Sequence, residues 1–273
     1  MISERQQGEE KYYSLITGAG CGIGRALAVE CASRSQNLLL VALPGKELNE
    51  TQTFIRNNFD VECYCLGIDL SQHCSATEVF NWTKKNKFKV NVLINNVGIG
   101  SKGAFEEMPV EFYYTQLNLN VVNTCILTRV FIDELKLNTP SYILNVGSLG
   151  GFFSIPDKVV YSASKSFVHS FSKSLRLELR EMDISVSLLC PGGTDSNRKT
   201  IASNKDLKGF AKLSVLQPEV VAREGIEGMM KKKATIIPGF FNRAYFHLSK
   251  ISPQFVEDFF VLNAFKHVKK HSY

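Results

Sequence analysis

The chain alternates short apolar segments with longer segments whose apolar residues recur every three to four positions. The short segments are apolar at nearly every position, which is typical of strands buried on both faces of a parallel sheet. The longer segments predict amphipathic helices that cover such a sheet. This order predicts an α/β fold, a doubly wound and mostly parallel sheet of seven strands with helices on both faces. The predicted strands are Tyr12–Ile16, Asn37–Ala42, Val61–Leu66, Val90–Ile94, Ser141–Val146, Ile184–Leu189 and Ala234–Ile237. The predicted helices are Ile23–Arg34, Lys46–Asn58, Ser71–Lys85, Val110–Leu135, Val159–Arg180 and Pro218–Lys231.

No internal repeat or linker interrupts the alternation, so residues 1–273 are predicted to form a single domain. The longest irregular stretch, about residues 192–217, follows a predicted strand. Ligands of open α/β sheets bind at the carboxyl ends of the strands, so this stretch is predicted to be a substrate loop. The Phe-rich extension, residues 239–273, has no continuous basic face, so we expect it to pack in the core or against a second subunit rather than on a membrane.

Composition narrows the class of protein. With 273 residues, 44% of them hydrophobic, the chain can bury a sizeable core. The net charge of +6 is scattered apart from Lys231–Lys233 and Lys269–Lys270, which favours solvated surface over nucleic-acid binding. No segment approaches about 18 uninterrupted apolar residues and no signal-peptide pattern begins the chain, so we expect no membrane span and a cytoplasmic location.

Cysteine and histidine usage argues against disulfides and metals. Seven cysteines, an odd number without a C-x-x-C pair, indicate reduced and mostly buried thiols. The five histidines show no metal-ligand spacing, so no metal site is expected. They are His73, His169, His247, His267 and His271.

The segment TGAGCGIG, residues 17–24, places four glycines where the first strand turns into the first helix. Backbone N–H groups and the helix dipole form an anion site at such a turn, and a pyrophosphate is the obvious ligand. Ile23 stands where G-x-G-x-x-G would need its third glycine, so the spacing fits T-G-x-x-x-G-x-G instead. A tight turn without a ligand is the alternative.

Polar residues also end the third and fourth predicted strands. Asn95 and Asn96 must find partners at a buried strand terminus, so we expect them to brace the sheet and the glycine turn, while Gly98 leaves room for a ligand. Asp69 lies at the same edge, where it could accept a hydrogen bond from an adenine amino group. Capping of the Ser71 segment is the alternative for Asp69.

Three further residues suggest acid–base chemistry. Ser148 ends the fifth predicted strand, and Tyr161 and Lys165 lie four residues apart, on one face of the next helix. An ammonium near a phenol favours the phenolate and so lowers the tyrosine pKa toward neutral pH. Ser148 can donate a hydrogen bond to a substrate oxygen. Each residue alone has an ordinary structural explanation, but this order and spacing make a chance combination improbable.

Taken together, these motifs resemble the classical short-chain dehydrogenase/reductase family over roughly residues 11–240. The resemblance implies a Rossmann-type fold, a nicotinamide cofactor, Tyr161 as proton donor to a carbonyl, Lys165 as the residue that lowers the tyrosine pKa and holds the ribose, and Ser148 as the residue that polarises the substrate oxygen. The cofactor-binding residues it implies are Thr17, Gly18, Gly20, Cys21, Gly22, Ile23, Gly24, Lys46, Asp69, Leu70, Asn96, Val97, Gly98, Tyr161, Lys165, Pro191, Gly192 and Thr194.

The resemblance leaves two positions to choose. The family's fourth catalytic residue is an asparagine that kinks the long fourth helix and anchors a water. Asn118 and Asn120 are the two candidates for this asparagine, and the spacing to Asn123-Thr124 favours Asn120. A hydroxyl after Pro191-Gly192 contacts the carboxamide in the family. Ser196 takes the usual place here and Thr194 comes earlier, so either can serve.

The end of the second strand bears on the cofactor. An acidic residue there binds the ribose of NAD, and a basic one accepts the 2′-phosphate of NADP. Leu43, Pro44 and Gly45 are neither, and Lys46 precedes the first carboxylate, Glu47. NADP(H) is therefore favoured, with NAD(H) as the alternative.

The favoured function is reduction of a carbonyl or oxidation of a secondary alcohol. A catalytically silent nucleotide-binding or regulatory protein is the alternative from another class, and enoyl reduction or sugar epimerisation would be other reactions on this fold. The aromatic and aliphatic residues Phe152, Phe153, Phe210 and Leu213 favour a lipophilic ketone or 3-oxoacyl substrate, unless they only pack the loop. The apolar helices around residues 112–131 and 166–179 agree with the homodimer or homotetramer that the family implies.

Overall fold

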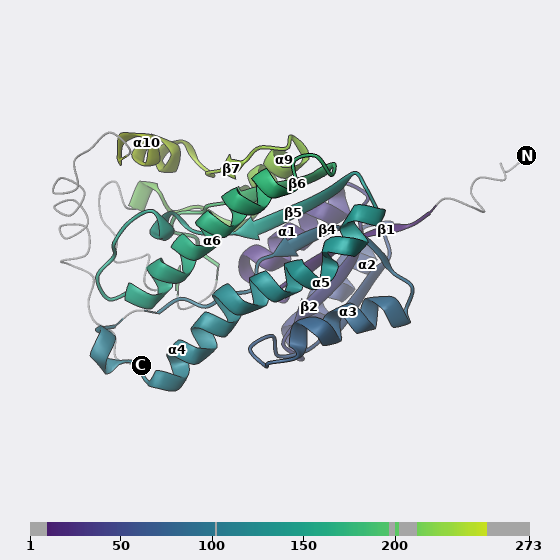
Figure 1. The fold of residues 1–273 in the computed structure, drawn as a ribbon, viewed down its shortest axis with the longest axis horizontal. Helices are drawn as coiled ribbons and strands as arrows, with labels where there is room; N and C mark the ends of the chain where they lie inside the picture. The colour runs from purple at the N-terminus through teal and green to yellow at the C-terminus, as the bar shows by residue number, and fades with distance from the viewer. Residues whose placement is uncertain (1–9, 102, 197–199, 202–211, 250–273) are drawn as a thin grey trace, which may run out of the picture.

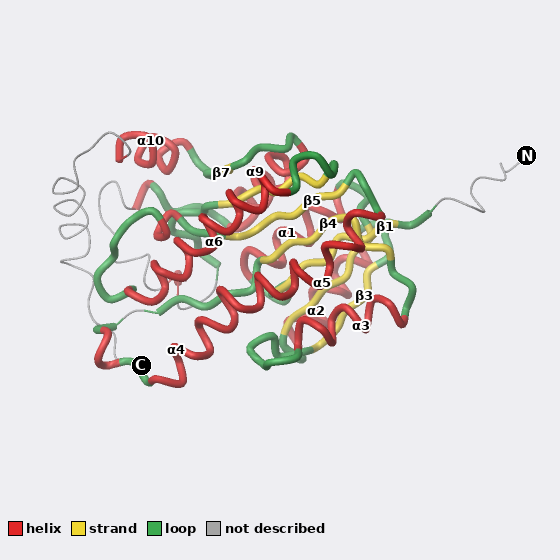
Figure 2. The backbone as a smooth tube through the Cα atoms, viewed as in Figure 1, coloured by secondary structure: helices red, strands yellow, loops and turns green. Residues whose placement is uncertain are grey.

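The computed structural model describes residues 10–101, 103–196, 200–201 and 212–249. Seven parallel strands form one sheet in the order β3-β2-β1-β4-β5-β6-β7, with helices on both faces (Figures 1 and 2), which confirms the predicted Rossmann-type fold. The strands are β1 (Tyr12–Thr17), β2 (Asn37–Ala42), β3 (Cys63–Gly67), β4 (Lys89–Asn95), β5 (Ser141–Val146), β6 (Ile184–Leu189) and β7 (Thr235–Ile236). The helices are α1 (Gly22–Ser33), α2 (Lys46–Asn58), α3 (Ser75–Lys85), α4 (Val110–Leu117), α5 (Asn123–Leu137), α6 (Val159–Glu178), α9 (Pro218–Met230) and α10 (Phe240–Ser249).

Strand β2 shows why the apolar runs are continuous. Successive side chains of a strand point to opposite faces. Leu38 and Leu40 join the core cluster under α1, α2 and α9, whereas Leu39 and Val41 join the cluster under α3, α5 and α6. All four are fully buried. Both faces of the sheet are therefore covered, and strand positions with a polar side chain need an internal partner.

The strand order reverses beside β1, whose neighbours are β2 on one side and β4 on the other. The crossovers after β1 and after β4 leave in opposite directions, so the carboxyl ends of these two strands border the crevice at the switch point. The fold thus places the predicted glycine turn and the segment after Asn95 next to each other.

Three predicted elements differ in the structure. The single helix Val110–Leu135 is divided by a π-helical segment, Asn118–Val122, which separates α4 from α5. Helix α3 begins at Ser75 rather than Ser71. The first part of the Phe-rich extension forms α10, and its Phe246 is buried in a third apolar cluster. The rest of that extension lies outside the described residues. Among the helices described, none has the length and apolar character needed to cross a bilayer.

Candidate active site

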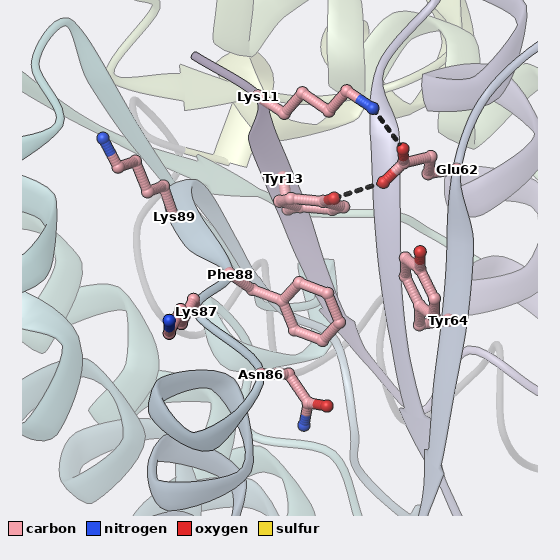
Figure 3. Close-up of a pocket in the computed structure, with 8 residues that line it drawn as sticks. All are labelled: Lys11, Tyr13, Glu62, Tyr64, Asn86, Lys87, Phe88 and Lys89. Carbon is pink, nitrogen blue, oxygen red and sulfur yellow. Dashed lines mark hydrogen bonds and ion pairs between the residues drawn. The ribbon is translucent and has the colours of Figure 1, made fainter.

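The predicted site residues lie at or after the carboxyl ends of strands β1 to β6, in the π-helical segment Asn118–Val122, or on the first two turns of α6. A surface hollow lies elsewhere: Figure 3 shows it lined by residues from the amino ends of strands, among them Lys11, Tyr64 and Lys89. The hydrogen bond from Tyr13 to Glu62 and the ion pair of Lys11 with the same carboxylate lie in this hollow. It is at the other end of the sheet from the predicted chemistry and forms no part of the candidate active site.

The glycine turn lets α1 start close against β1. A Cβ on Gly24 would lie 2.0 Å from the carbonyl oxygen of Gly18, so only glycine fits there, and Gly18 has a positive φ of 65°. No described side chain caps the first turn of α1, which also has no acidic residue. Its free N–H groups leave an electropositive site for an anion. The turn therefore fits the pyrophosphate of a dinucleotide.

Asn95 and Asn96 brace this edge of the sheet, as predicted. The Thr17 hydroxyl oxygen accepts from the backbone N–H groups of Asn96 and Val97, both at 3.0 Å, and the Asn96 amide donates to the Thr17 carbonyl at 2.8 Å. The Asn95 amide donates to Asn145 on β5 at 2.8 Å. The strand end after β4 is thus tied to the glycine turn on one side and to β5 on the other.

Asp69 is hydrogen-bonded within the turn that follows β3 and does not cap α3, whose N-cap residue is Cys74, and its contact with adenine stays a prediction. One carboxylate oxygen accepts from the backbone N–H and the hydroxyl of Ser71, at 2.9 and 2.8 Å, and the other accepts from Gln72. These hydrogen bonds lower the Asp69 pKa. They also hold residues 71–74 in a turn, which explains the later start of α3. The neighbouring Leu70 is buried in the core.

Tyr161 and Lys165 lie on one face of α6, below the turn that carries Ser148. The Tyr161 ring lies between two glycines: an added Cβ would be 3.8 Å from the ring at Gly100 and 3.5 Å from it at Gly150. The hydroxyls of Ser148 and Tyr161 are hydrogen-bonded, and this contact lowers the Tyr161 pKa. The Ser148 oxygen also accepts from the Gly150 N–H at 3.0 Å, which holds it beside the Tyr161 hydroxyl.

Burial governs the electrostatics of Tyr161 and Lys165. Burial raises the Tyr161 pKa by more than the Ser148 hydrogen bond lowers it. Lys165 is 5% exposed, and its ammonium donates to the Val146 carbonyl at 2.8 Å. Burial lowers the Lys165 pKa to about 8. Desolvation is thus the larger effect on both groups in this structure, and the role of Lys165 in lowering the Tyr161 pKa stays a prediction.

Asn120 lies beside Lys165, whereas Asn118 donates to the Ser71 carbonyl, away from it. Asn120 is 1% exposed, and its side-chain oxygen accepts from the Ile99 N–H at 2.9 Å. Its amide donates to the Ile99 carbonyl and to the Ser164 hydroxyl, both at 3.0 Å. Because Asn120 stands in the π-helical segment, its side chain is directed at the loop after β4.

The remaining predicted cofactor residues lie around the same edge. Thr194 is buried, and its hydroxyl donates to the Gly192 carbonyl at 3.2 Å; the Ser196 hydroxyl is paired with Thr200. Lys46 starts α2, is 83% exposed and pairs with Glu50 at 3.5 Å. Glu47 contacts the glycine turn itself, because its carboxylate hydrogen-bonds the exposed Cys21 thiol. No sequence pattern predicts that contact.

The predicted apolar substrate wall has another role. The Phe152 ring packs at a tilt on His169 and edge-to-face on Phe246, with centroids 4.0 and 4.7 Å apart, and Phe153 packs on Tyr245. Their side chains join the loop after Ser148 to α10, so the prediction that they line the cleft is wrong, and the packing alternative holds. Leu213 is exposed, and Phe210 lies outside the described residues.

Sequence reasoning missed two buried residues behind Ser148. His169 continues the stripe of Tyr161 and Lys165 by one more helical turn, and its ring is within 3.5 Å of the Cys190 sulfur, measured from Nε2. The i, i+4, i+8 spacing was the signal that could have found His169. Over the described ranges, no three His, Cys, Asp or Glu residues gather as a metal site would require.

Comparison with known proteins identifies the class. A family model described as short chain dehydrogenase matches residues 13–206, so the chain belongs to the short-chain dehydrogenase family of oxidoreductases. A very-long-chain 3-oxoacyl-CoA reductase of Danio rerio is 28% identical over 185 residues, 66% of this chain and 57% of that protein. The chain thus spans less than three fifths of that relative's length. A probable short-chain type dehydrogenase/reductase, VdlC of Helicobacter pylori, is 32% identical over 222 residues, 81% of this chain and 78% of that protein.

Solved structures agree in fold. An alcohol dehydrogenase from Comamonas testosteroni specific for bulky-bulky ketones has a TM-score of 0.73 at 26% identity, covering 89% of this chain and 95% of its own. A short-chain dehydrogenase from Sphingobium yanoikuyae in complex with NADPH has a TM-score of 0.77 at 23% identity, with 97% and 98% covered. One from Burkholderia phymatum in complex with NAD has a TM-score of 0.76 at 24% identity, with 89% and 92% covered.

Proposed function

We propose that this protein is an NADP(H)-dependent oxidoreductase that interconverts a carbonyl and a secondary alcohol, with Tyr161 as the proton donor. The observation that carries the proposal is the closeness of the Ser148 side chain to the Tyr161 hydroxyl, with the buried Lys165 one turn along the same helix. When bound, the nicotinamide would supply or accept the hydride. Cofactor binding is supported by the glycine turn at the uncapped start of α1.

The residues have distinct roles in this proposal. Ser148 donates a hydrogen bond to the substrate oxygen, and Tyr161 gives that oxygen its proton. The raised pKa of Tyr161 keeps the phenol protonated at neutral pH, which suits reduction of a carbonyl. Lys165, with a pKa of about 8, is close enough to neutrality to return a proton to the site. Asn120 links the Ile99 backbone to the Ser164 hydroxyl of α6, next to Lys165 in the sequence, and so fixes the base of the site.

The proposed substrate is a lipophilic ketone or a 3-oxoacyl compound. Two comparisons support this class: the 3-oxoacyl-CoA reductase of Danio rerio and the ketone-specific enzyme of Comamonas testosteroni. Phe152 and Phe153 do not support this substrate class, because they pack against α10. Gly100 and Gly150 lie on either side of the Tyr161 ring, so in this proposal the carbonyl approaches Tyr161 at its hydroxyl.

The proposed preference for NADP(H) rests on Lys46, a basic residue near the end of β2 with no carboxylate before it. A specific observation favours NAD(H) as the second candidate. The Glu47 carboxylate lies at the glycine turn, next to Cys21, where it would repel a 2′-phosphate and could accept a hydrogen bond from a ribose hydroxyl.

We also propose a cytoplasmic homodimer or homotetramer built on the faces of α4, α5 and α6. Exposed apolar side chains support this assembly, because large ones stand out along these helices. They are Val110, Tyr114, Leu117, Val122, Ile126, Phe167 and Leu177. The proposed cytoplasmic location rests on the seven cysteines of the sequence, an odd number without a C-x-x-C pair, which favours reduced thiols.

The test is steady-state oxidation of NADPH and NADH with a panel of aliphatic ketones, aromatic ketones and 3-oxoacyl thioesters. Tyr161→Phe keeps the ring between the two glycines but removes the proton donor, so turnover should fall by at least about 10²-fold with cofactor affinity unchanged. Tyr114→Phe, at an exposed position on α4, is the matched control. Tight cofactor binding without turnover of any carbonyl would favour a silent nucleotide-binding protein. Retained activity in Tyr161→Phe would refute the assignment of the donor.

A further inference from the structure

His169 lies directly beneath the turn that carries Ser148. An added Cβ on Gly147 would be 3.0 Å from its Nε2, and one on Gly151 would be 2.7 Å from its Cε1. The imidazole therefore occupies the space that these two glycines leave on either side of Ser148. It is 5% exposed and packs on Phe152, so its position is tightly defined.

The polar atoms of the His169 ring have partners at the Ser148 turn. The imidazole hydrogen-bonds the Ser148 backbone, and Nε2 is 3.5 Å from the Cys190 sulfur. The Cys190 thiol, fully buried, also contacts the Ser148 backbone. A buried backbone group without a partner is costly. His169 and Cys190 thus partner the backbone of the residue whose side chain must face Tyr161.

We propose that His169 is a positioning residue, a neutral imidazole wedge that holds the Ser148 turn so that the Ser148 hydroxyl faces Tyr161. The inference rests on the proposed function, since it concerns the same active site. The neighbours that define its place belong to the Ser148 turn, so it acts through Ser148 rather than on substrate. Burial lowers its pKa to about 4, and the nearby Lys165 adds to that effect. The ring therefore adds no second positive charge beside the lysine at neutral pH.

The experiment is a mutant cycle in the full chain with the most active ketone of the panel. His169→Leu removes the ring nitrogens, and His169→Gln restores an amide near the outer edge of the ring. Each is made alone and with Ser148→Ala. We expect His169→Leu to lower kcat by about tenfold and His169→Gln to recover most of it, whereas His169→Leu in the Ser148→Ala background should cost less than about twofold. KM for the cofactor should not change.

The control is Leu175→Ala, which removes partly buried apolar contacts on the same helix but faces the other core cluster. It should lower stability without changing the Ser148 coupling. An equal loss from His169→Leu in both backgrounds would overturn the proposal, because the effect would then be general to the fold. If His169→Leu does not fold, His169→Met, which fills the space without a ring nitrogen or an amide, replaces it.

A second readout separates this inference from the proposed function. The backbone amide resonance of Ser148 should shift in His169→Leu and return toward its wild-type position in His169→Gln, and it should stay in place in Leu175→Ala. If no carbonyl is turned over, the proposed function fails, and the resonance alone decides whether His169 holds the Ser148 turn. An unmoved Ser148 resonance in His169→Leu would overturn the inference even in a fully active enzyme.

Discussion

Gly98→Ala should damage the site through one side chain, that of Asn120. A Cβ on Gly98 would lie 2.8 Å from the Asn120 side-chain oxygen and 3.4 Å from the Lys165 nitrogen. The first distance is well inside van der Waals contact, so the Asn120 amide must move and weaken its two hydrogen bonds to Ile99. Each is worth about 0.5–1.5 kcal/mol, so the free energy of unfolding should fall by about 1–3 kcal/mol.

Gly100→Ala is the matched control, two residues along the same loop. Its Cβ would meet the Tyr161 ring at 3.8 Å, an ordinary contact. We therefore expect less than about 0.5 kcal/mol for this change. Thermal unfolding should show Gly98→Ala lower in Tm by several degrees, at about 2–4 °C for each kcal/mol, and Gly100→Ala close to wild type. Equal Tm values for the two variants would refute the reasoning from the Asn120 contact.

Three further predictions follow from the same structure. In fluorescence titrations, Lys46→Ala should weaken the binding of NADPH by about tenfold more than the binding of NADH. If Lys46→Ala has no effect and Glu47→Gln binds NADPH more tightly than the wild type does, the result would favour NAD(H) as the cofactor. Lys165 has a pKa of about 8 in the folded protein and about 10.4 in the unfolded chain, so the unfolded state binds more protons between these two pH values. In denaturant titrations, the free energy of unfolding of the wild type should therefore rise from pH 8 to 10 relative to that of Lys165→Met, by up to about 3 kcal/mol. A difference between the two proteins that does not change with pH would contradict this prediction. Light scattering should show an oligomer that Ile126→Lys converts to monomer, and a wild-type monomer at micromolar concentration would contradict the proposed assembly.

The sheet could be predicted because each strand is buried on both faces. β2, β5 and β6 have the predicted bounds, and the other strands shift by a residue or two. Parallel strands with covered faces must be apolar at successive positions, and that pattern is local in the sequence. The spacing of Tyr161 and Lys165 is equally local, since one helical turn separates them. Local patterns of this kind carry over directly from sequence to structure.

The features that could not be predicted depend on contacts between distant segments. The direction of the Tyr161 pKa shift is set by desolvation. The spacing of residues in the sequence does not show how strongly a side chain will be desolvated. The π-helical segment is recognisable only from its consequence, the Asn120 amide paired with Ile99. The sequence allows Phe152 to face either a substrate or the protein. In the structure it packs on Phe246, which comes almost a hundred residues later in the chain.

Helix α10 shows how such distant contacts reach the active site. It lies beyond residues 13–206, the part that the family model matches. Its Asn242 is 2% exposed and donates to the carbonyls of Pro238 and Ser214, and its side-chain oxygen would be 2.6 Å from a Cβ on Gly192. Its Phe246 packs on Phe152, which in turn packs on His169. One helix thus supports both the loop after Ser148 and the turn after Pro191, so the geometry of the candidate active site depends on a segment outside the residues that the family model matches.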